Sequence, residues 1–218
     1  MAKRKTLTLA VATLPLLAMV TVGCSDEKNE KEGVPVPQLA KEFCDSSLTP
    51  AAAKAFEKLF AGQNVKEASD SGKLTEAAEE LKQATGDDVS TCGVVSYGSV
   101  DYGMRIEFGW SYGPWSPDDT SEYAFFTAGD RAFSNGRFAY VLVKCSASVP
   151  KLDPDEEHYL LVSLNGPEAD LPLAERQKLL VSIVYPVLRK MAGVVGCKEA
   201  ADLPASPSLS TTAAPEVT

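Results

Sequence analysis

The stretch Tyr102-Gly-Met-Arg-Ile-Glu-Phe-Gly-Trp-Ser-Tyr112 alternates in character from one residue to the next. Every even position is apolar: Tyr102, Met104, Ile106, Phe108, Trp110 and Tyr112. The odd positions hold glycine or polar residues: Gly103, Arg105, Glu107, Gly109 and Ser111. Successive side chains of a strand point to opposite faces, so this pattern predicts a long strand with one buried and one wet face.

Further strands are expected on its C-terminal side. Asn135-Gly136 separates residues 131–134 from the apolar run 137–145 and predicts a hairpin. The expected turn is type I′, which needs positive φ at both central residues. The run 137–145 is apolar on both faces, so we place it centrally in the sheet. Residues 158–164 predict another strand, and residues 94–97 a shorter one.

Helices are expected on both sides of these strands. Thr49 followed by Pro50 is typical of a helix start, and Gly62 marks its end. Residues 73–84 place apolar side chains at helical spacing. The order of elements therefore predicts an α+β fold, with an antiparallel sheet of about four or five strands packed with helices.

A long helix is expected towards the C-terminus. Asp170 is the expected N-cap, and the apolar face extends to Met191. Pro186 lacks an N–H, so a kink is expected there. Gly193 and Gly196 are expected to unwind the helix.

The first residues have the composition of an export signal. A basic segment, residues 1–5, precedes the uncharged apolar run Thr6–Gly23 and then Cys24. Residues 20–24 resemble the lipobox of bacterial lipoproteins, with Thr21 where leucine is usual. This resemblance implies cleavage before Cys24 and a diacylglyceryl or palmitate-type anchor on its sulfur. An uncleaved anchor and ordinary cleavage after Gly23 are the alternatives.

The chain is expected to divide into four parts. Residues 1–23 form the signal peptide, and residues 24–38 a charged, proline-containing tether. Residues 39–200 form one α+β domain. Residues 201–218 are rich in Pro, Ser, Thr and Ala, which predicts a disordered tail.

The cysteine count agrees with export and lipidation. Of five cysteines, commitment of Cys24 to lipid leaves an even number. The other four, Cys44, Cys92, Cys145 and Cys197, are too far apart in sequence for a zinc site and predict two disulfides. Of three connectivities, we favour Cys44–Cys92 and Cys145–Cys197, which would tie each helical segment to a neighbouring strand.

Three motifs resemble a family of secreted actinobacterial lipoproteins. They are Cys44 to Pro50 before a short helix, Cys92-Gly93 opening a strand, and Asn135-Gly-Arg137 leading to Cys145. The chain resembles the DUF3558-like domain over residues 40–165, although Val94 stands where tryptophan is usual. The resemblance implies no assigned activity.

No residue set predicts catalysis. His158 is the only histidine and adjoins the acidic residues 153–157, which we interpret as a solvated turn rather than a calcium site. No cofactor or metal site is predicted. The net charge of −9 argues against nucleic-acid binding.

Aromatic residues are the best binding candidates. They concentrate in residues 97–115, where alternation directs most of the strand aromatics into the core. Trp115 lies beyond the alternation and is the candidate ligand contact.

We therefore expect a non-enzymatic lipoprotein on the outer face of the cell membrane, binding an unknown envelope protein or small ligand. The alternatives are a structural envelope protein and a cell-envelope hydrolase using Asp118, Asp119 or Glu107.

Overall fold

The computed structural model describes residues 33–83, 88–96, 102–147, 149, 152–153 and 155–215. The predicted signal peptide, Cys24 and most of the tether lie outside these residues. The chain divides into two units, Met1–Lys31 and Glu32–Thr218, and the second contains everything described below.

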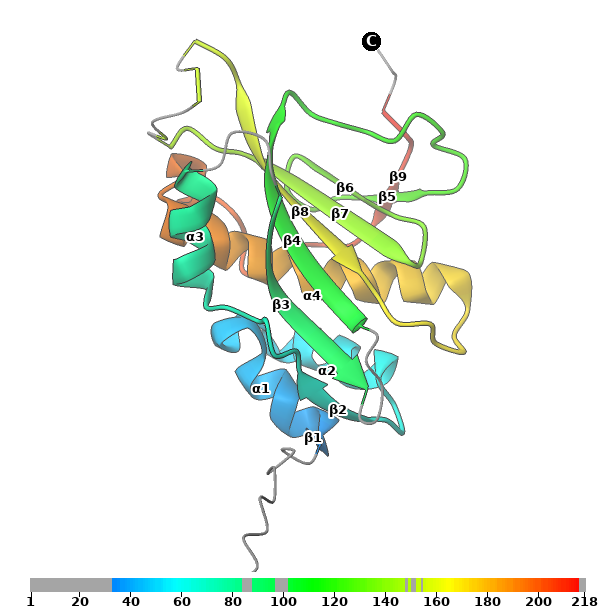
Figure 1. Cartoon of the computed structure of the whole chain (residues 1–218). Helices are drawn as coiled ribbons and strands as arrows, with labels where there is room; N and C mark the ends of the chain where they lie inside the picture. Colours follow the sequence, from blue (N-terminus) through cyan, green and yellow to red (C-terminus); the bar gives the residue numbers. More distant parts are fainter. Residues whose placement is uncertain are drawn as a thin grey trace, which may run out of the picture. The chain divides into compact units, whose positions relative to one another are not determined.

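The described strands form one antiparallel sheet in the order β1-β2-β3-β4-β8-β7-β6-β5-β9 (Figure 1). Their bounds are β1 Val34–Pro35, β2 Asn64–Glu67, β3 Val89–Ser96, β4 Tyr102–Tyr112, β5 Ala124–Phe126, β6 Arg131–Ser134, β7 Phe138–Lys144, β8 His158–Asn165 and β9 Thr211–Thr212. The α+β class is confirmed, but nine strands exceed the four or five predicted. The strands that were missed, β1, β2, β5 and β9, are only two to four residues long, too short to show an alternation.

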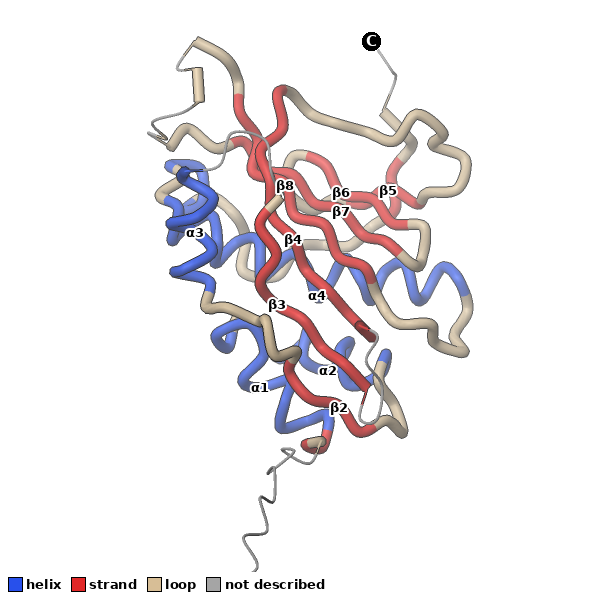
Figure 2. The backbone as a smooth tube through the Cα atoms, viewed as in Figure 1, coloured by secondary structure: helices blue, strands red, loops and turns tan. Residues whose placement is uncertain are grey.

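Helices cover one face of this sheet, behind the strands in Figure 2. Their bounds are α1 Val36–Ser46, α2 Pro50–Leu59, α3 Leu74–Gln83, α4 Leu173–Val195 and the 3-10 helix η1 Lys198–Ala201. Helix α4 packs on β6, β7 and β8, α3 on β3, and α1 on β2. The main core lies between the sheet and these helices.

Local sequence explains how α2 and α3 begin. The Thr49 hydroxyl accepts a hydrogen bond from Ala52 N, as the predicted N-cap requires. Helix α3 confirms the helix predicted at 73–84, but its first turn is held by a distant residue. Leu74 N donates to Asp45 Oδ2 at 2.7 Å, across 29 positions of sequence.

Helix α4 differs from its prediction at both ends. Asp170 does not cap it: Pro172 is the N-cap residue, without a side-chain hydrogen bond. The helix runs through Pro186 and also through Gly193, which was expected to unwind it. Gly196 ends it with φ of 94°, a conformation that glycine adopts without strain.

Strand β4 confirms the alternation over most of its length. Met104, Ile106 and Phe108 are fully buried against the helices. The pattern fails at the C-terminal end of the strand, where Tyr112 is 62% exposed. Tyr112 is therefore an exception to the expectation that most of the strand aromatics point into the core, and its ring meets that of His158 instead.

The predicted hairpin joins β6 and β7, but its turn is not type I′. Gly136 has φ of 86°, whereas Asn135 is not among the residues with positive φ. Pairing starts at Ser134 and Ala139, so the turn is longer than two residues. Asn135 Oδ1 instead accepts from Arg137 N at 3.0 Å and Phe138 N at 2.7 Å. Strand β7 lies between β6 and β8, as its apolar faces predicted.

The domain extends further at both ends than predicted. Val36 is buried in α1, before the expected boundary at residue 39. The segment after Ala201, expected to be a disordered tail, follows the domain surface instead (Figure 1). Tyr185 Oη donates to Pro204 O at 2.9 Å, and β9 pairs with β5. Leu209, partly buried against the core, explains this order.

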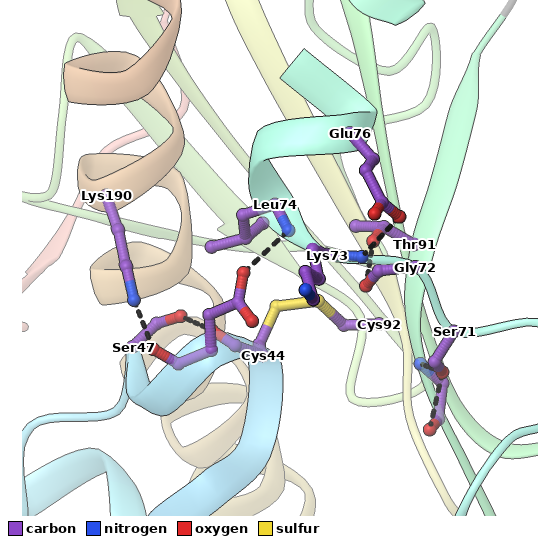
Figure 3. Close-up of a disulfide and its surroundings, with 12 residues drawn as sticks. Cys44, Ser47, Ser71, Gly72, Lys73, Leu74, Glu76, Thr91, Cys92 and Lys190 are labelled. Carbon is purple, nitrogen blue, oxygen red and sulfur yellow. Dashed lines mark hydrogen bonds between the residues drawn. A yellow bond between two sulfur atoms is a disulfide. The ribbon is translucent and has the colours of Figure 1, made fainter. Parts of the chain in front are cut away.

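The disulfides are Cys44–Cys92 and Cys145–Cys197, the pairs favoured above. The first joins α1 to β3 beside the start of α3 (Figure 3). The second joins the residue after β7 to the residue directly before η1.

Candidate functional site

The sheet face opposite the helices, here called the open face, carries its own aromatic cluster. The strand registers place Phe133 of β6 beside Tyr140 of β7, and Leu142 beside Leu161 of β8. The buried members of this cluster are Phe125, Phe133, Leu142 and Tyr159, with Tyr123, Tyr140 and Leu161 packed against them. The sheet therefore presents apolar rings on the side without helices.

The loop 113–123 brings Trp115 onto this cluster. The Trp115 ring centroid is 5.4 Å from that of Phe133 and 5.1 Å from that of Tyr140, the latter edge to face. Arg131 of β6 anchors the loop through hydrogen bonds from Nη1 to Pro114 O and Ser116 Oγ. Trp115 is nevertheless 40% exposed, so part of its ring remains available to a ligand.

A hollow of about 410 Å³ lies on the open face, within the size range of small-molecule sites. We call it the open-face hollow. Its lining residues are Asp88, Glu107, Gly109, Trp110, Ser111, Trp115, Tyr140, Leu161 and Ser163. It includes both tryptophans of the chain. The structure thus brings together two residues selected separately from the sequence, Trp115 and Glu107.

Gly109 gives the hollow its acidic wall. A Cβ at this position would lie 2.2 Å from Asp88 Oδ1, so the carboxylate occupies space that any other residue would fill. The neighbouring Trp110 is fixed from the helix-covered side of the sheet, because its Nε1 donates to Leu81 O of α3 at 3.0 Å. The odd positions of β4 and the residue before β3 therefore shape one site.

The charges around the hollow are mainly negative. Glu107 Oε1 lies 3.2 Å from Arg105 Nε, which also donates to Ser90 Oγ at 2.7 Å. The pKa of Tyr140 is raised, first by burial, then by Tyr123 when that phenol is ionised, and by the negative charges of Glu107 and Asp88. The hydroxyl of Tyr140 therefore stays protonated at neutral pH and can donate a hydrogen bond.

The other carboxylates selected from the sequence lie outside the hollow. Asp118 and Asp119 are exposed on the loop. Asp119 Oδ1 accepts from Ser121 Oγ at 2.6 Å and Ser121 N at 2.9 Å, and these hydrogen bonds lower its pKa. An ionised carboxylate of this kind is poorly suited to general-acid catalysis.

His158 is buried, and its contacts stabilise the fold. It is 8% exposed, and its Nε2 lies 2.6 Å from Asp153 O, so the ring nitrogen donates to a main-chain carbonyl. Its ring meets Tyr112 edge to face at 5.2 Å. Within the described residues, Nδ1 has no partner and no group of acidic, histidine or cysteine side chains could hold a metal ion.

A second hollow, of about 390 Å³, lies beside the β6–β7 turn. Its charged lining mixes Arg137 and Arg176 with Glu168 and Asp170, and none of its described lining residues is aromatic. Mixed charge without an apolar wall selects no ligand class, so the open-face hollow is the stronger site.

Comparisons of the chain with protein-family models, with curated proteins and with solved structures found no match. Across the described part of the chain, none of the helices has both the length and the apolar character needed to span a membrane.

Proposed function

We propose that this chain is an exported lipoprotein, held through Cys24 on the outer face of the cell membrane, whose domain binds a ligand without transforming it. The open-face hollow is the observation that supports ligand binding. It combines an exposed tryptophan ring, oriented hydroxyls and carboxylates on a rigid sheet, as a small-molecule site requires.

The proposed location on the outer face of the membrane is supported by the sequence around Cys24 and by the disulfides. Two disulfides in a domain of this size favour an oxidising compartment. The resemblance to DUF3558-like lipoproteins points to the same location and belongs to this proposal.

Metabolic labelling with a fatty acid tests the anchor. The wild type is expected to incorporate label, and Cys24→Ala to lose it and leave the membrane fraction. Equal labelling of both proteins would contradict the proposal.

Capture from solubilised cell envelopes tests the binding site. The wild type is expected to retain a ligand that Trp115→Ala loses, because the indole forms a wall of the hollow. Tyr112→Ala is the matched control, since Tyr112 is more exposed than Trp115 but does not line this hollow. Loss of ligand in both variants, or in neither, would count against the site.

One observation favours the alternative of a cell-envelope hydrolase, because Asp88 and Glu107 line the same hollow. Envelope fragments incubated with the wild type should remain intact if the protein only binds. Cleavage that disappears in Asp88→Asn/Glu107→Gln, with the fold unchanged, would establish the hydrolase instead.

A further inference from the structure

We infer that the open-face hollow takes an amine-bearing small molecule, with its positive nitrogen between the carboxylates of Asp88 and Glu107 and the rings of Trp115 and Tyr140. This inference rests on the proposed function and specifies the ligand class. The volume of the hollow suits an amino sugar or a short polyamine.

The charge of the lining is the first argument. Among the described residues of the lining, the charged side chains are Asp88 and Glu107, and both are acidic. Arg105 lies on the same face outside the lining and pairs with one oxygen of Glu107. A carboxylate has about four lone-pair positions, so this pair orients Glu107 and leaves it able to accept from a ligand. An anionic ligand would meet two like charges here.

The aromatic walls are an independent argument. The face of a tryptophan or tyrosine ring attracts a cation, and tryptophan does so most strongly. Trp115 and Tyr140 meet edge to face at 5.1 Å, so their planes form an angled corner beside the carboxylates. Rings next to carboxylates favour an ammonium group over a neutral one, because both kinds of group stabilise positive charge.

The polar remainder of the lining suits a hydroxylated ligand. Ser111 Oγ donates to Gly113 O at 2.9 Å, which fixes its direction and leaves its oxygen able to accept. Ser163 lines the same hollow from β8. These hydroxyls can bond to the ring substituents of an amino sugar.

The matched probes are glucosamine, N-acetylglucosamine and glucose, which share a ring but differ in charge. The full chain in detergent micelles provides an internal signal, because both of its tryptophans line the hollow. Glucosamine is expected to change the tryptophan fluorescence with saturation, and added salt to weaken its binding. The two neutral sugars are expected to bind about tenfold more weakly or worse.

Charge-removing variants locate the effect. Asp88→Asn and Glu107→Gln are each expected to weaken glucosamine binding about tenfold while leaving N-acetylglucosamine unchanged. Glu42→Gln removes an equal charge from the surface of α1 and should have no effect. Near-ultraviolet circular dichroism and thermal unfolding check that each variant is folded.

Each other outcome has a definite meaning. Equal binding of glucosamine and the neutral sugars would overturn the amine inference and leave the hollow as a ligand site. No saturable binding of either glucosamine or spermidine would also overturn it, while envelope capture would still decide the proposed function. If Glu42→Gln weakened glucosamine binding as much as the two hollow variants do, net charge alone would explain the change. This outcome would also overturn the amine inference.

Discussion

Three consecutive residues near the first disulfide have a backbone conformation that is costly for anything but glycine. Cys44, Asp45 and Ser46 have φ of 54°, 56° and 59°. Such left-handed residues cost about 1–2 kcal/mol each unless surrounding contacts compensate. Here Cys44 is joined to Cys92, Asp45 caps α3, and Lys190 donates to Asp45 O (Figure 3). These contacts hold the turn in place.

Ser46→Gly is expected to stabilise the domain. Ser46 is exposed, and glycine adopts its positive φ without steric cost, so the free energy of unfolding should rise by up to about 1 kcal/mol. Urea unfolding measures this change. Ala51→Gly on the exposed side of α2 is the control and should lower stability by about 1 kcal/mol. Destabilisation of similar size by both variants would contradict the strain argument.

Glu199 makes stability sensitive to acid. Its carboxylate accepts from Ser146 N at 2.9 Å and from Ser146 Oγ. Partial burial opposes the ionised form, but these hydrogen bonds prevail and lower its pKa. The stabilisation is therefore present above the ordinary pKa of glutamate, and is lost as pH falls towards the lowered pKa of the folded state.

Glu199→Gln tests this contribution. It should lower stability at neutral pH and flatten the acid side of the stability profile. Urea unfolding across the acidic range measures both effects. A variant whose profile stays parallel to that of the wild type would exclude a role for this carboxylate.

At the scale of elements, the sequence predicted those parts whose periodicity is long. Helices α2 and α3, the length of β4 and the central position of β7 follow from spacing and caps. Helix α1 was missed because Pro35 and Pro37 adjoin its start and its last residues leave helical geometry. Strands β5 and β9 were missed because three and two residues are too short to show an alternation.

The candidate site shows the same division between local and distant information. Trp115 and Glu107 stood out as a loop aromatic and a wet-face carboxylate, but no local signal relates them. Trp115 reaches the hollow that Glu107 lines because Arg131 anchors the loop that carries Trp115. Tyr140 was not recognised as a site residue, because the run 137–145 is apolar on both faces and nothing distinguishes Tyr140 within it. Nothing in the sequence near Asp88 marked it as part of the site, since it lies over Gly109 of another strand.

Removal of residues 202–218 is expected to destabilise the domain and open its edge. The core would lose the packing of Leu203 and Leu209, and Tyr185 Oη would lose its acceptor, which together cost about 2–4 kcal/mol. Strand β5 would become an edge strand able to pair with another copy. Thermal unfolding and light scattering measure these effects. An unchanged unfolding temperature after this deletion would show that the C-terminal segment adds nothing to the stability of the domain.

At the scale of the whole domain, each disulfide ties the helical layer to the sheet. Cys44–Cys92 does so at β3, and Cys145–Cys197 does so where β7 and α4 end. Their sequence separations, 48 and 52 positions, are almost equal. Loop closure in the unfolded chain therefore assigns each about 4 kcal/mol. Any difference between them must come from the folded state.

Cys44→Ala/Cys92→Ala is expected to cost less stability than Cys145→Ala/Cys197→Ala. Without the first disulfide, Cys44 to Ser46 can relax from positive φ, which returns about 1–2 kcal/mol. The positive φ beside the second disulfide belongs to Gly196, where it has no steric cost to return. Urea unfolding of both double variants measures the difference, with Cys24→Ala as a control that leaves both disulfides in place. Equal losses would show that the turn is held by the Asp45 and Lys190 contacts without the disulfide. A larger loss at Cys44–Cys92 would mean that this disulfide also positions α1 for packing on α2 and β2.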